Sequence, residues 1–168
     1  SCLLSGDMSS NGSAYFTQVA MKNLEGVFGH AERCVFREGT VTLGADALLM
    51  ANKCAAVGAN DPGANIPIID CNGSGRIAMR QFSGEVIIQN KTSGGNCSLS
   101  LIGAVITLDS TITSGDWVIS GVGAVIDNPT GTATVDVTNL ITDGALLEEA
   151  YAYARKASDN AEQANLKL

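Results

Sequence analysis

Three short segments of the chain are near copies of one another, and they constrain its fold more than any other feature. They share the pattern x-x-Gly-x-Val-Ile-x and occupy residues 82–88, 101–107 and 121–127. A period of about 20 residues with one glycine and one β-branched pair per unit is typical of stacked repeats. Each unit buries its apolar row against its neighbours, so the pattern predicts an elongated stack.

From residue 34 onward, short stretches of apolar and β-branched residues separated by turn residues are typical of β-strands. They include residues 34–36, 40–43, 48–50 and 134–137. Extending the repeat over residues 34–141 predicts about five coils. We therefore expect a mainly β fold, with a parallel β-solenoid (β-helix) over residues 33–142. An antiparallel β-sandwich or β-prism is the alternative, because short strands at roughly 8–12-residue spacing also fit it.

The composition fits a folded, turn-rich β-protein. Apolar residues make up 45% of the 168 residues and charged residues only 16%, with 19 glycines, whereas disorder requires low hydrophobicity and high charge. The net charge is −7 and the basic residues are scattered. Phosphate binding needs clustered Lys and Arg, so no nucleic-acid partner is expected. No run of about 18 apolar residues occurs, so no membrane span is expected either.

The N-terminal residues 1–32 are predicted to form a lead-in and one capping helix. Phe16, Val19, Leu24 and Val27 recur at a spacing close to that of one helix face. A helix placed before a solenoid would cover the apolar surface and the unpaired strand edge at the end of the stack.

The C-terminal residues 143–168 change in character. Apolar residues there are separated alternately by three and four positions, which is an unbroken a/d heptad register. We predict a coiled-coil helix whose seam is the oligomer interface, formed by Leu147, Ala150, Ala154, Ala157, Ala161, Ala164 and Leu168. The alternative is a single amphipathic helix that packs back on the solenoid.

The five cysteines do not form a recognisable metal motif. No C-x-x-C pair exists, and one histidine is too few for the usual zinc sites. Cys34 and Cys54 lie one repeat apart, so in a stack they would sit above one another. Two interpretations remain for the cysteines: they are buried free thiols, or some pair of them forms a disulfide. The five are Cys2, Cys34, Cys54, Cys71 and Cys97.

Little in the sequence indicates catalysis. His30 is the only histidine, and it lies at the predicted end of the capping helix, where a cation offsets the dipole. Asp70, Asp109 and Asp127 fall at similar places in the repeats, where stacked carboxylates would bind a cation or cleave a polysaccharide. Asp at such places more often ends a strand in a turn. We predict a non-enzymatic protein with no cofactor and no catalytic or metal-binding residue.

The order of a helical cap, a Gly/Val/Ile-rich β-stack and an alanine heptad tail, AYAYARKASDNAEQA at residues 150–164, resembles the tail-fibre and tail-spike-like structural proteins of bacteriophages. The resemblance implies a virion shaft or attachment protein that assembles with itself, usually as a homotrimer. It also implies other virion structural proteins and a host surface glycan or receptor as partners. A bacterial adhesin, extracellular or on the cell surface, and a β-helix polysaccharide depolymerase are the alternatives.

Overall fold

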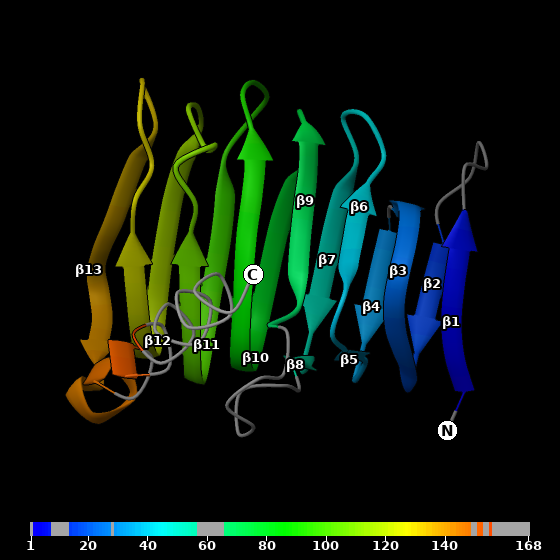
Figure 1. Cartoon of the computed structure of the whole chain (residues 1–168), viewed down its shortest axis with the longest axis horizontal. Coiled ribbons are helices and arrows are strands. Elements are labelled where there is room, and N and C mark those ends of the chain that lie inside the picture. The colour runs from blue at the N-terminus through cyan, green and yellow to red at the C-terminus, as the bar shows by residue number, and fades with distance from the viewer. Residues whose placement is uncertain are drawn as a thin grey trace, which may run out of the picture.

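The computed structural model describes residues 2–7, 14–27, 29–56, 66–148, 151, 152 and 155. They form a mainly β structure, a parallel β-solenoid of about five turns, which confirms the predicted fold class. The strands lie side by side along the long axis of the molecule, from β1 at one end to β13 at the other (Figure 1). Every pairing between neighbouring strands is parallel.

Each turn of the solenoid, called a rung below, crosses two faces that meet at a corner. The first face holds β2 (Ala14–Thr17), β4 (Gly29–Glu32), β7 (Leu48–Asn52) and the start of β10 (Arg76–Lys91), β11 (Cys97–Leu108), β12 (Asp116–Asp127) and β13 (Thr134–Thr142). The second face holds β6 (Thr40–Leu43), β9 (Ile68–Gly73) and parts of β1 (Cys2–Asp7), β3 (Val19–Val27), β10, β11 and β12. Two short strands, β5 (Val35–Phe36) and β8 (Ala55–Ala56), follow the corner.

The core consists of inward-facing side chains that stack from rung to rung. On the first face, one buried row is Phe16, Ala31, Ala51, Met79, Leu99 and Ile119. On the second face, a buried row is Leu24, Val41, Ile69, Ile88 and Leu108. Within each row, a side chain is covered by the equivalent residues of the adjacent rungs, which is how a repeat too small to have its own core becomes stable.

The predicted capping helix is wrong, because these residues form strands β2 and β3 of the stack. In β3 the buried residues Met21, Leu24 and Val27 are spaced by three. The strand bends at Asn23 and Gly26, which have positive φ angles of 49° and 69°. In a regular strand every second side chain points inward, and each bend adds one residue between two inward side chains. The resulting spacing of three resembles that of one face of a helix.

The three near-identical segments are not aligned in the structure as they are in the sequence. Val86 of β10 pairs with Ile106 of β11, and Ile106 pairs with Val125 of β12. The register shifts beside Gly84 and again between Ile102 and Ala104. The Val-Ile pair of the middle copy is therefore displaced by one residue relative to the other two.

The segment after β13 begins as a short helix that packs on the solenoid. Among the described residues it is the one helix, and its first residue is 144. The Oδ1 of Asp143 accepts hydrogen bonds from the amides of Ala145 (3.1 Å) and Leu146 (3.3 Å), which is an N-cap. Leu146 and Leu147 then cover Val105 and Ala124, which face out of the solenoid.

Leu147, the first position of the predicted heptad seam, therefore contacts its own chain. The remaining seam positions lie outside the described residues: Ala150, Ala154, Ala157, Ala161, Ala164 and Leu168. The described helix is too short to show a coiled coil, so this assignment stays a prediction.

Candidate functional site

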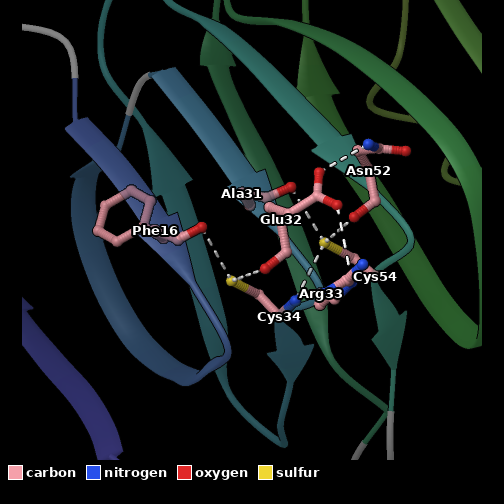
Figure 2. A network of polar contacts seen from close by, with 7 residues as sticks. All are labelled: Phe16, Ala31, Glu32, Arg33, Cys34, Asn52 and Cys54. Carbon is pink, nitrogen blue, oxygen red and sulfur yellow. Dashed lines mark hydrogen bonds and ion pairs between the residues drawn. The ribbon is translucent and has the colours of Figure 1, made fainter.

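Two cysteines lie directly above one another at the corner of adjacent rungs. Cys34 and Cys54 follow the paired residues Glu32 and Asn52, and they precede the paired residues Val35 and Ala55. The backbone amide of Cys34 donates to the Sγ of Cys54 at 3.4 Å. This confirms the prediction that one repeat places the two thiols in a stack, as Figure 2 shows.

The sulfur atoms of this thiol pair, Cys34 and Cys54, are surrounded by backbone carbonyls. The Sγ of Cys34 lies 3.5 Å from the carbonyl oxygens of both Phe16 and Glu32. The Sγ of Cys54 lies 3.3 Å from the carbonyl oxygen of Ala31. Figure 2 draws these contacts as dashed lines. Both cysteines are only 1% exposed. The pair is thus held at a defined place in the core.

The two thiols differ in acidity because each is influenced by its neighbour in the stack. The hydrogen bond from the Cys54 side chain lowers the pKa of Cys34, although burial acts in the opposite direction. The same hydrogen bond, together with burial, raises the pKa of Cys54. The pKa values of the two thiols are thus shifted in opposite directions, downward for Cys34 and upward for Cys54.

Polar contacts on the outer side of the corner hold the two rungs in register. The Nδ2 of Asn52 donates to the Oε2 of Glu32 at 2.6 Å. The amide of Arg33 donates to the carbonyl oxygen of Asn52 at 2.9 Å. Arg33 has a positive φ of 54° and its side chain is exposed, so it marks the corner on the solvent side of the thiol pair.

Cys71 and Cys97 are two further buried free thiols. Cys71 lies in β9 and Cys97 in β11, and β10 runs between them. Burial raises the pKa of Cys71 to about 12 and also raises the pKa of Cys97. Close to both, the buried Lys91 donates from Nζ to the carbonyl oxygens of Gly75 (3.0 Å) and Ser93 (2.9 Å).

A row of exposed apolar side chains follows the outside of the solenoid at its C-terminal end. Ile102 pairs with Val122, and Val122 pairs with Ile141, so three successive rungs contribute one residue each. Their exposed fractions are 54%, 41% and 69%. We call these three residues the apolar row. Sequence reasoning missed it, because in the sequence these residues look like ordinary strand residues.

The aspartates considered as a stacked row do not line up. Asp70 pairs with Gln89, whereas Asp127 pairs with Leu108. The Oδ1 of Asp70 accepts from the amide of Asn72 at 2.7 Å, and the Oδ1 of Asp109 accepts from the amide of Thr111 at 2.8 Å. Both contacts are local, as in Asx turns. The Asp70 carboxylate also accepts from the Nε2 of Gln89 and the Nδ2 of Asn90 on the next rung, each at 3.0 Å.

His30 is in strand β4 and not at a helix end. Its ring lies 5.8 Å from that of Tyr15 on the preceding rung, centroid to centroid. In the described part of the chain, no three His, Cys, Asp or Glu residues are grouped so that they could hold a metal ion. The same residues include no helix with the length and apolar character needed to span a bilayer.

Comparisons with known proteins identify no relative. No family model, no curated protein and no solved structure matches the chain.

Proposed function

We propose that this protein is a non-enzymatic shaft subunit of a fibre- or spike-type assembly, built from several copies of the chain. The observation that carries the proposal is the apolar row, which runs along the long axis of the solenoid. A shaft needs a rigid body and a contact surface parallel to its axis, and this chain has both.

The apolar row suits lateral contact with a second copy. Its members lie on neighbouring strands and so are about 4.8 Å apart along the axis. Contiguous exposed apolar surface typically marks an interaction site, because its burial contributes about 25 cal/mol per Å². The neighbouring exposed residue Val118 differs, since its partners across the strands are the polar residues Ser98 and Asp136.

The row also leads into the predicted coiled coil. Ile141 is near the end of β13. Leu147 packs on its own solenoid, and the next predicted seam position is Ala150. Copies that align their apolar rows would bring the starts of their C-terminal helices together. The helices would then set the number of chains, for which we propose three, as in the phage fibres that the sequence resembles. A virion is the corresponding location, with other virion proteins and a host surface glycan or receptor as partners.

The experiment compares two valines of β12 with similar exposure, Val122 at 41% and Val118 at 44%. Val122→Lys puts a charge in the apolar row, whereas Val118→Lys puts the same charge between polar neighbours. Mass photometry of the full chain should show an oligomer for the parent and for Val118→Lys, and smaller species for Val122→Lys. A parent chain that stays monomeric at micromolar concentration would overturn the proposal.

A further inference from the structure

We propose that Cys34 and Cys54 are a modification site for small peroxides, at which oxidation joins two adjacent rungs by a reversible disulfide. The proposal rests on the placement of the two sulfurs and not on the function proposed above. It assigns a chemical role to two thiols that also pack in the hydrophobic core.

The placement of the backbone permits the bond. Residues paired across parallel strands lie about 4.8 Å apart, inside the range of roughly 4.4–6.8 Å between the Cα atoms of disulfide-bonded cysteines. Parallel Cα–Cβ directions keep the Cβ atoms slightly farther apart than a relaxed disulfide prefers. The bond therefore carries strain, and strained disulfides are the more easily reduced ones.

The chemistry needs one nucleophilic thiol and one resolving thiol, and the pair supplies both. The Cys34 thiolate attacks one oxygen of hydrogen peroxide, the O–O bond breaks, and Cys34 becomes a sulfenic acid as one water leaves. The Cys54 sulfur then attacks the Cys34 sulfur, the S–O bond breaks, and a second water leaves. Two thiols and one peroxide thus become one disulfide and two waters.

Hydrogen peroxide is the oxidant that fits the burial of the site. Both cysteines are 1% exposed, so a bulky disulfide reagent would have to open the core. A molecule close to water in size needs only a small opening at the corner, beside the exposed Arg33. The disulfide would close a loop of one rung, which restricts the unfolded chain and raises the temperature of unfolding.

The test treats the folded full chain with hydrogen peroxide, removes the peroxide, and counts thiols after unfolding. The parent should lose two of its five thiols, and dithiothreitol should restore them. Cleavage by trypsin together with a protease that cuts before Asp separates the relevant cysteines. Cys34 then lies in residues 34–37, Cys54 in 54–60 and Cys71 in 70–76. The cross-linked product should join the first two peptides.

Matched variants separate this pair from the other thiols. Cys71→Ala combined with Cys97→Ala should still lose two thiols and should show the same upward shift in unfolding temperature after oxidation. Cys54→Ala should lose both the cross-link and the shift. The proposal is overturned if the parent keeps five thiols, if the cross-link contains Cys2, Cys71 or Cys97, or if Cys34 accumulates only sulfinic acid while Cys54 stays reduced.

Discussion

At the scale of single residues, the glycines of the repeated segments have different physical roles. Gly84 has a φ of +84°, and a Cβ there would lie 2.0 Å from the carbonyl oxygen of Ala56 on the preceding rung. Gly103 has a φ of +64°, and a Cβ there would have no atom within 4 Å. Both positions favour glycine for their backbone conformation, but only Gly84 also permits close approach of two rungs.

Alanine substitution should therefore separate these two roles. Gly103→Ala should cost about 1–2 kcal/mol, the usual penalty for an L-residue in the left-handed region. Gly84→Ala should cost clearly more, because the strands β8 and β10 must also move apart. Urea unfolding followed by circular dichroism measures both free energies. Equal losses for the two variants would mean that the rungs adjust freely and that the close approach is unimportant.

At the scale of elements, the short helix after β13 depends on its cap and on its packing against the solenoid. The Oδ1 of Asp143 accepts hydrogen bonds from two amides of the first turn, and Leu146 and Leu147 pack against Val105 and Ala124. Residues Val105 and Ala124 would otherwise expose apolar surface on the second face of the solenoid. The helix therefore protects a part of the sheet that is not covered by stacking.

Replacing the cap should loosen the helix and leave the solenoid folded. Asp143→Ala should reduce the stability of the helix by about 1 kcal/mol, the typical value of an N-cap. Hydrogen exchange should then become faster at the amides of Leu146 and Leu147, with little change in β11. Asp127→Ala, at the exposed end of β12, serves as the control. The cap assignment is wrong if both variants exchange like the parent.

At the scale of the whole molecule, the heptad seam and the apolar row are the two surfaces proposed to join copies of the chain. The alanine positions of the seam leave room for helices to approach closely, and a buried charge there would be unpaired. Ala157→Glu should therefore reduce the oligomer to smaller species or separate its helices, whereas Ser158→Glu should not. Sedimentation velocity of the full chain distinguishes these results. If both variants keep the size and thermal transition of the parent, the seam is not an interface.

Several features of this protein follow from the sequence alone. The period of about 20 residues predicts a stacked β-fold, because the apolar row of each unit is buried by neighbouring units. The same period places Cys34 above Cys54, since they are one repeat apart and no register shift falls between their paired neighbours. Where the rungs are regular, the spacing of residues in the sequence is enough to predict which residues lie above one another.

Other features were decided by the tertiary structure. Residues 14–27 have a helix-like spacing, but the bends at Gln18, Asn23 and Gly26, where φ is positive, turn that spacing into the rungs of a sheet. The Val-Ile segments look equivalent in the sequence, yet a register shift makes Ile106 and not Val105 face the core. Whether a side chain points to the core or to solvent depends on how many extra residues the preceding corners and bulges contain. A shift of one residue turns the side chains of a strand to the opposite face. Those shifts arise from contacts between rungs, so only the assembled stack determines them.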